Sequence, residues 1–446
     1  MRLKVSCDHV CIEEKRYILS TLFRFLNIDV EFQVTEDVED YILMYGDASI
    51  RIKNEFFASQ DETVFVKTTN IPRGVVRLSS CKWFNTLLFL YGEDRFEITD
   101  KTIYCGGDIF GSAFFMLSRW EELLLPKDKF GRCDENEIFV VKHGIQERPI
   151  VNEYVCLLEK MLEYIGFPLP NRRRKFNVRL THDIDYLFRY DVKNVCVNLV
   201  GDILHRKSFD AFVRTLVNYV RFKIGKIKDP FDTFDWFMDL SESCGLLDEF
   251  YFKAAIGGEY DCTYDVRDKR VKNIMKHIVE RGHVIGFHPS KNTFHNPEQF
   301  KKEIDRLRSL GFEIKGGRQH FLLYDLPATL RIWAENDLSY DAGLGFYAHV
   351  GFRCGCCYEY PFWDVVKRQE LPILIRPMVV MEGALFQQTM DVGILTERIC
   401  QLLDSVRKYQ GEFVFLWHND NLGREQFKHL KPVYTNVINY IKGIIA

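Results

Sequence analysis

The chain lacks an apolar run long enough to span a bilayer. A transmembrane helix needs about 20 consecutive apolar residues, and the nearest candidate, residues 83–91, is far shorter. The first residues, 1–8, also lack the apolar segment of a secretion signal. We therefore expect a cytoplasmic protein with no transmembrane segment.

An excess of charge of one sign is also missing. The sequence has 60 Lys and Arg residues against 63 Asp and Glu, which gives a formal net charge of −3. Proteins that bind nucleic acid attract the phosphate backbone with an excess of positive charge. The overall composition therefore gives no electrostatic case for a nucleic-acid partner.

The cysteines show no spacing typical of a disulfide framework. There are 13 of them, an odd number, which suits a reducing compartment where thiols act as small core residues. Cys354, Cys356 and Cys357 lie close together, but no second pair at zinc-finger spacing accompanies them. A structural zinc site there is disfavoured.

No internal repeat or low-complexity segment divides the chain, but its length of 446 residues exceeds what one hydrophobic core usually holds. The clearest boundary is the turn-forming stretch Pro168–Asn171. We predict an accessory domain of α+β class over residues 1–170 and a larger domain over residues 171–446.

In the larger domain, strand-like and helix-like patterns alternate, which predicts βα units and a parallel sheet, open or closed as a barrel. Asn296 and Pro297 predict the N-cap and first position of one helix. The expected strands cover 284–287, 338–340, 371–375 and 412–417, and the expected helices cover 265–281, 297–310, 327–336 and 392–409.

Two carboxylates, Asp183 and Asp185, follow a strand-like run over residues 176–180. On an extended segment, residues two apart share one face. Like charges this close resist joint ionisation unless a cation lies between them or one keeps a proton. A turn or helix cap would also explain two Asp residues here.

Further polar residues follow later strands of the predicted sheet. In parallel α/β folds the carboxyl ends of the strands meet at one edge, where active sites lie. An imidazole with a neighbouring carboxylate is also a common ligand set for zinc. We therefore expect one composite site that combines the Asp pair with His288, Arg318, His320, Asp341 and His418.

Four motifs in this order resemble those of the polysaccharide deacetylase superfamily: Thr181–Asp185, Gly282–His288, Arg318–Phe321 and Leu416–His418. The resemblance covers about residues 176–420 and implies a distorted parallel (β/α) barrel. The preceding segment looks like an uncharacterised N-terminal domain that accompanies some bacterial members. Residues 288–290 and 351–355 resemble a subgroup attached to bacterial surface-polysaccharide gene sets.

The resemblance implies a metal site, with Zn²⁺ or another divalent transition metal held by Asp185 and His288. Most members carry a second histidine four residues after the first, where this chain has Asn292. An amide oxygen is a poorer zinc ligand than imidazole. We therefore predict His320 as the third ligand, with Asn292 and His295 as the remaining candidates.

The resemblance also assigns the proton chemistry. Asp183 matches the catalytic base, Arg318 the arginine that keeps this base ionised, and His418 the general acid. Asp341 lies where a carboxylate that tunes the acid is expected. A metal would polarise an acetamide carbonyl and a water molecule, while the two side chains move protons.

We accordingly predict a metal-dependent hydrolase that removes an N-acetyl group from an amino sugar or glycan precursor. Arg353 is a candidate for binding a carboxylate or phosphate of the substrate, and an internal salt bridge is its alternative. Two other functions remain open: a catalytically inactive, deacetylase-like glycan-binding protein, and a hydrolase of an ester or cyclic amide on the same scaffold. The oligomeric state is not predicted.

Overall fold

The computed structural model describes residues 2–58, 60, 65–171, 174–255, 261 and 264–445. The chain divides into two compact units that are not consecutive in sequence. Unit 1 comprises residues 1–177, 322–380 and 402–413, and unit 2 comprises residues 178–321, 381–401 and 414–446. The predicted domains 1–170 and 171–446 remain a prediction, because these units interleave along the chain.

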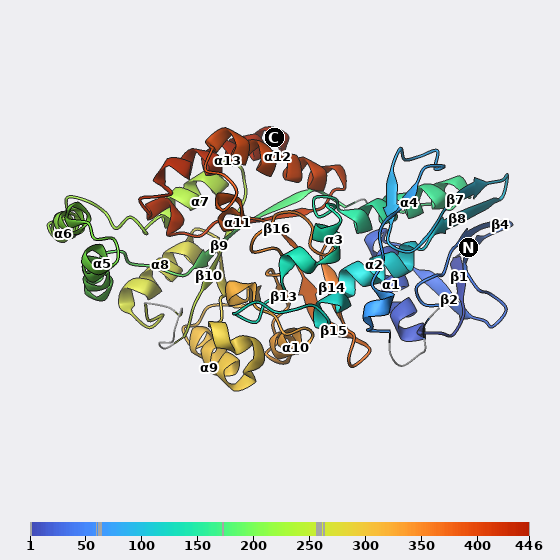
Figure 1. The fold of residues 1–446 in the computed structure, drawn as a ribbon, viewed down its shortest axis with the longest axis horizontal. Coiled ribbons are helices and arrows are strands. Elements are labelled where there is room, and N and C mark those ends of the chain that lie inside the picture. Colours follow the sequence, from blue (N-terminus) through green and yellow to red (C-terminus); the bar gives the residue numbers. More distant parts are fainter. Residues whose placement is uncertain are drawn as a thin grey trace. The chain divides into compact units, whose positions relative to one another are not determined.

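Unit 1 contains a six-stranded mixed sheet in the order β2-β1-β3-β4-β8-β7 and a two-stranded sheet of β5 and β6 (Figure 1). The strands of these two sheets are β1 (Leu3–Cys7), β2 (Val30–Val34), β3 (Tyr41–Tyr45), β4 (Ala48–Ile52), β5 (Val76–Leu78), β6 (Leu87–Phe89), β7 (Gly92–Ile98) and β8 (Thr102–Gly107). The α-helices of this part are α1 (Ile12–Phe25), α2 (Ile109–Ser118), α3 (Phe139–Lys142) and α4 (Ile150–Tyr164).

Helix α2 forms the centre of this core because it is apolar on all sides. Every residue of α2 is buried, as expected for a helix with no polar face. Asp108 caps its first turn by accepting a hydrogen bond from the Gly111 backbone N–H at 2.7 Å. Later segments of unit 1 add α10 (Ala328–Glu335) and strands β13 (Tyr340–Asp341), β14 (Tyr360–Asp364) and β15 (Gln369–Ile375).

Unit 2 contains four neighbouring parallel strands, β9 to β12. Strand β10 is buried along its whole length, which is typical of parallel strands covered on both faces. The elements of this unit are β9 (Asn177–Ile184), α5 (Val192–Leu204), α6 (Phe209–Lys223), α7 (Phe234–Glu242), β10 (Asp248–Phe252), α8 (Lys269–Glu280), β11 (Val284–Phe287), α9 (Pro297–Arg308), β12 (Gly316–Gly317), α11 (Glu382–Phe386) and α13 (Lys431–Ile445). Among the described strands and α-helices, four cross from one unit into the other along the chain: β9, of which only Asn177 belongs to unit 1, β16 (Met378–Met381), α12 (Val392–Lys408) and β17 (Glu412–Leu416).

The mixed α/β class is confirmed, whereas the complete parallel barrel that we predicted is not found among the described residues. The strands form open sheets. Strand β14 runs antiparallel to β15, while β13 runs parallel to β15. The strand order therefore does not follow from serial βα units alone.

No helix in the described part of the chain is long and apolar enough to cross a membrane.

Candidate metal and catalytic site

Strand β9 carries the paired carboxylates at its carboxyl end. Asp183 is within the strand and Asp185 follows directly after it. The preceding motif residue His182 is fully buried, and its two ring nitrogens lie 2.8 Å from the Trp417 carbonyl and 3.2 Å from Asp248 Oδ1. His182 is thus held in the core, while the two carboxylates that follow it belong to the site.

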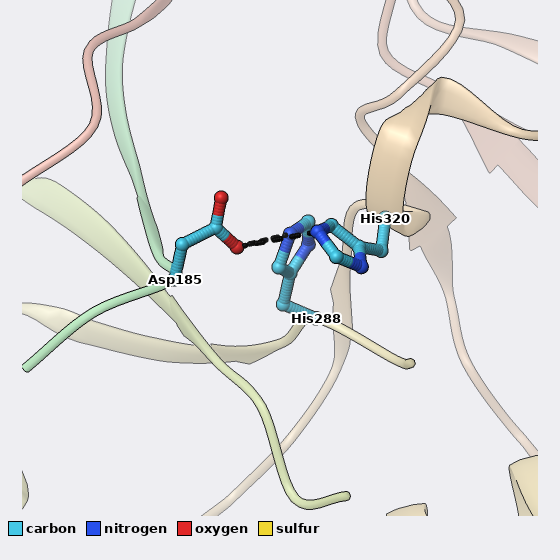
Figure 2. A group of neighbouring side chains, drawn as sticks. All are labelled: Asp185, His288 and His320. Carbon is cyan, nitrogen blue, oxygen red and sulfur yellow. Dashed lines mark ion pairs between the residues drawn. The ribbon is translucent and has the colours of Figure 1, made fainter. Parts of the chain in front are cut away.

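The structure brings together Asp185, His288 and His320, whose donor atoms all lie within 4.8 Å of one another. Figure 2 shows the carboxylate of Asp185 facing the two imidazole rings. Asp185 Oδ1 lies 3.4 Å from His288 Nε2 and 3.5 Å from His320 Nε2. Asp185 Oδ1 and His288 Nε2 are buried, and neither makes a hydrogen bond of acceptable geometry among the described residues, although the Lys253 ammonium lies 2.8 Å from Asp185 Oδ1. One carboxylate and two imidazoles arranged in this way fit a divalent transition metal.

The backbone fixes which nitrogen of His288 faces the cluster. His288 Nδ1 lies 2.7 Å from the Arg318 carbonyl oxygen, which can only accept a hydrogen bond. Nδ1 therefore carries the proton, and Nε2 is left with a free lone pair for a ligand.

His320 is the second imidazole of the cluster. Its Nδ1 lies 3.5 Å from the Asp261 carboxylate and makes no hydrogen bond among the described residues. Burial, together with the nearby charge of Lys253, lowers the pKa of His320 to about 4. The ring is therefore neutral near pH 7, as a metal ligand must be.

Lys253, directly after β10, introduces a positive charge into the same cluster. Its Nζ lies 2.8 Å from Asp185 Oδ1 and 2.8 Å from His320 Nε2. Burial acts to raise the pKa of Asp185, but the Lys253 ammonium and the two imidazoles hold it well below its usual value. The sequence patterns gave no signal for this lysine, because only the pairing of β10 with β9 brings it to the site.

Asp183 is paired with Arg318 as the resemblance implied. Arg318 is fully buried and donates to Asp183 Oδ1 at 2.7 Å and to Thr181 Oγ1 at 2.9 Å. Burial acts to raise the pKa of Asp183, and the Arg318 guanidinium overrides this effect and holds it below its usual value. Asp183 is therefore an ionised carboxylate, which a general base requires.

The close approach of β11 and β12 places both Arg318 and His288 at the site. Gly317 pairs with Phe287, and a Cβ on Gly317 would lie 1.8 Å from the Phe287 carbonyl oxygen. Only glycine permits the backbones to be this close. The next residues, Arg318 and His288, then lie within reach of the carboxylates of β9.

His418, two residues after the end of β17, is bound to a carboxylate that sequence reasoning missed. Glu382, at the start of α11, accepts hydrogen bonds from His418 Nδ1, from its backbone N–H and from Asn421 Nδ2, each at 2.7 Å. Burial acts to lower the pKa of His418, but the Glu382 carboxylate raises it to about 10. His418 Nε2 is directed toward the site, 3.9 Å from Asp185 Oδ2.

Asp341, which we expected beside His418, is hydrogen-bonded to Tyr324 instead. The carboxylate beside His418 is Glu382, and the Asp341 carboxylate accepts hydrogen bonds from the Tyr324 hydroxyl at 2.8 and 2.9 Å. Asp341 belongs to unit 1, as does Tyr324. The resemblance implied Asp341 for the role beside His418, but the carboxylate bound to His418 comes from Glu382, the first residue of the short helix α11.

Arg353 is enclosed in internal ion pairs, which corrects our prediction that it binds substrate. Its guanidinium donates to Glu122 at 2.9 and 3.0 Å and to Glu135 at 2.8 Å, and all three side chains are buried within unit 1. Buried arginine of this kind is held by its carboxylate partners. The salt-bridge alternative is therefore the one the structure supports.

The remaining candidates for the third ligand differ from the cluster in burial. Asn292 and His295 are both exposed, on the 3₁₀ turn Lys291–His295 between β11 and α9, whereas His288 and His320 are buried. His295 is not one of the residues whose donor atoms group with Asp185.

Comparison with known proteins gives limited information. Residues 3–166 match the model of a family of unknown function (DUF7033). No curated protein matches the chain. Among solved structures, the chain is similar to a crystal structure from Mycobacterium smegmatis described as a candidate polysaccharide deacetylase, with 13% identity over 63% of this chain and 87% of that chain, at a TM-score of 0.39. A likeness of this size establishes neither fold nor activity, so the site geometry must carry any functional conclusion.

Proposed function

We propose that this protein is a metal-dependent hydrolase that releases acetate from an N-acetylated amino sugar or glycan precursor. The observation that carries the proposal is the grouping in unit 2 of a potential metal-ligand set with two proton-transfer groups. Asp185, His288 and His320 form the ligand set. Asp183 and His418 are each bound by a partner of opposite charge. Zn²⁺ is the metal that this mixture of nitrogen and oxygen donors suits well.

Each proton-transfer group has the charge that amide hydrolysis requires. A bound divalent metal would polarise the acetamide carbonyl and the attacking water. Asp183, kept ionised by Arg318, accepts the proton of the water. His418, kept protonated by Glu382, donates a proton to the departing amine. The assignment of a sugar as the amine-bearing group rests on the sequence resemblance, whereas the proposed cytoplasmic location rests on the sequence features described above.

The test is release of acetate from a panel of N-acetylated amino sugars by the full chain loaded with zinc. We expect activity in the wild-type protein and a loss of at least 100-fold in Asp183→Asn, which removes the base without changing its size. Asp235→Asn, an exposed position, is the matched control and should retain activity. A metal-loaded wild-type protein that releases no acetate, or an active Asp183→Asn protein, would refute the proposal.

One observation favours a non-catalytic, glycan-binding relative as the second candidate. The Lys253 ammonium already lies within hydrogen-bond distance of two of the three potential ligands, so the chain itself supplies a cation to this group. A binding-only protein would purify without metal, take up none on titration, and still bind N-acetylated sugars in a calorimeter. Metal uptake together with acetate release would exclude it.

A further inference from the structure

The helical hairpin of α5 and α6 exposes an unusual amount of apolar surface. Among the described residues, 22 large apolar side chains are exposed, and 11 of them lie between residues 192 and 224. They include Phe209, which is 75% exposed, and Leu204, which is 64% exposed. Isolated exposed apolar residues are normal, but a contiguous group marks a site of interaction.

These side chains follow helical spacing. On α6, Phe209, Val213, Leu216, Val217 and Val220 are exposed, and their spacing places them along one side of the helix. An amphipathic helix of a globular domain normally buries its apolar side, yet none of the 15 residues of α6 is buried. The apolar side of this helix therefore lacks a covering element in the described chain.

Figure 1 shows α5 and α6 as neighbouring helices, and polar contacts connect them. Asp202, near the end of α5, is fully buried and accepts a hydrogen bond from Thr215 Oγ1 of α6 at 2.7 Å. Its carboxylate also pairs with Arg206. Ser208 caps α6 by accepting a hydrogen bond from the Ala211 backbone N–H at 3.2 Å. These contacts fix the two helices to each other while their apolar residues remain exposed.

The hairpin and the residues just after it also carry a local excess of positive charge. Residues 192–228 contain eight Lys and Arg residues, all exposed, against only Asp202 and Asp210. This segment has a net charge of +6 within a chain whose net charge is −3. Its basic residues are Lys193, Arg206, Lys207, Arg214, Arg221, Lys223, Lys226 and Lys228.

We infer that the α5–α6 hairpin binds the surface of an anionic lipid bilayer, with its apolar side chains inserted among the acyl chains and its basic side chains at the headgroups. Exposed apolar side chains and clustered Lys and Arg are the two features that hold interfacial helices on acidic membranes. With 13 and 15 residues, the helices are too short to span a bilayer. A second copy of the same hairpin fits less well, because it would bring one charge of +6 against another.

The test is co-flotation of the full chain with vesicles, in phosphatidylcholine alone and in phosphatidylcholine containing 30 mol% phosphatidylglycerol. We expect binding to the anionic vesicles, at least tenfold weaker binding to the zwitterionic ones, and a decrease with added salt. The triple variant Leu204→Ser, Phe209→Ser, Val217→Ser should bind the anionic vesicles at least tenfold more weakly. A second triple variant, Arg221→Glu, Lys223→Glu, Lys226→Glu, should show the same loss. Because these side chains are exposed, circular dichroism should show an unchanged fold.

Matched control variants carry the same kinds of substitution, apolar to Ser and Lys to Glu, at exposed positions outside the hairpin. Val366→Ser with Ile394→Ser removes exposed apolar side chains outside the hairpin, and Lys101→Glu with Lys276→Glu and Lys301→Glu changes exposed charges there. All of these should bind vesicles as the wild type does. Absence of binding to anionic vesicles, or equal losses in the controls, would overturn the inference. So would a stable dimer that the hairpin variants dissociate and that does not bind vesicles.

Discussion

At the scale of single residues, Lys253 distinguishes this site from a simple metal-ligand triad. Its ammonium occupies hydrogen-bonding positions at Asp185 and His320 that a metal would also use. A divalent ion must therefore displace the ammonium, and part of its binding energy is spent in doing so. The affinity for metal is accordingly set by the lysine as well as by the three ligands.

Replacing Lys253 by Met, which keeps the length of the side chain without its charge, should tighten binding of Zn²⁺ at least tenfold. Isothermal titration against a competing chelator measures this affinity without relying on catalysis. Lys276→Met, at an exposed position, is the control and should leave the affinity unchanged. Equal or weaker binding in Lys253→Met would show that the ammonium does not compete with the metal.

Glu382 is the second residue whose role can be isolated. Its carboxylate raises the pKa of His418 to about 10, so removing the charge lowers the pKa and His418 loses its proton at a lower pH. We expect Glu382→Gln to lower kcat about 10- to 100-fold and to move the alkaline limb of the pH–rate profile toward neutral pH. The profile of kcat for acetate release against pH measures both effects.

Asp341→Asn serves as the comparison for Glu382→Gln, because the resemblance pointed to Asp341 and the structure points to Glu382. We expect the alkaline limb to stay in place in Asp341→Asn. A shift in that variant, with none in Glu382→Gln, would reverse the assignment.

At the scale of secondary-structure elements, the approach of β12 to β11 positions Arg318 and His288 together. In Gly317→Ala, the new Cβ would lie 1.8 Å from the Phe287 carbonyl oxygen, so the two strands must separate. We expect a loss of about 1–3 kcal/mol or more in the free energy of unfolding, with weaker zinc binding. Thermal denaturation and metal titration measure the two effects.

Gly443→Ala is the matched control for this substitution. Gly443 lies in α13, and a Cβ there would meet nothing within 4 Å. Alanine in the helix should stabilise the protein by up to about 1 kcal/mol. If Gly317→Ala behaved in the same way, the close approach of β11 and β12 would not be required for the site.

Several elements could be predicted from local signals in the sequence. Strand β11 has the predicted bounds, and α9 begins at Pro297 with Asn296 as its N-cap. These signals are local, because a cap or a glycine acts through its immediate neighbours. The antiparallel strand β14 was not predicted, and the alternating pattern left the choice between an open sheet and a closed barrel undecided, since strand order depends on contacts between segments far apart in the chain.

The same distinction applies to the site. Asp183, Asp185, His288 and His320 stand in short motifs that a sequence displays directly. Lys253 and Glu382 stand in no such motif, and each reaches the site only through tertiary packing. Motifs therefore indicated the candidate ligands, the proposed base and its partner Arg318, while Lys253 and Glu382, which also set charges at the site, could be identified only in the structure.

At the scale of the whole molecule, buried carboxylates link stability to pH. Burial raises the pKa of Glu121 to about 8, although its carboxylate accepts a hydrogen bond from the Phe139 backbone N–H at 3.0 Å. Because this value lies above that of an unfolded chain, the folded state holds the proton more tightly. Stability from this group is present at low pH and is lost as the pH rises toward 8.

The amide in Glu121→Gln does not titrate. The variant should therefore lack the loss of stability that ionisation of Glu121 causes as the pH rises toward 8. Between pH 5 and pH 8, we expect the free energy of unfolding of the wild type to fall by on the order of 2–5 kcal/mol more than that of the variant. Urea denaturation at the two pH values measures the difference. Glu425→Gln, at a position that is 88% exposed, should follow the wild type. Parallel curves for wild type and Glu121→Gln would rule out this linkage.

The central claim is that Asp185, His288 and His320 together hold one divalent metal. The most direct measurement is the stoichiometry of zinc bound to the purified full chain, determined by elemental analysis after equilibration and dialysis. The account predicts one equivalent in the wild type and in Asn292→Ala, and much less than one in His288→Ala and His320→Ala. A wild-type protein that binds no zinc, or an equivalent retained after loss of both histidines, would contradict it.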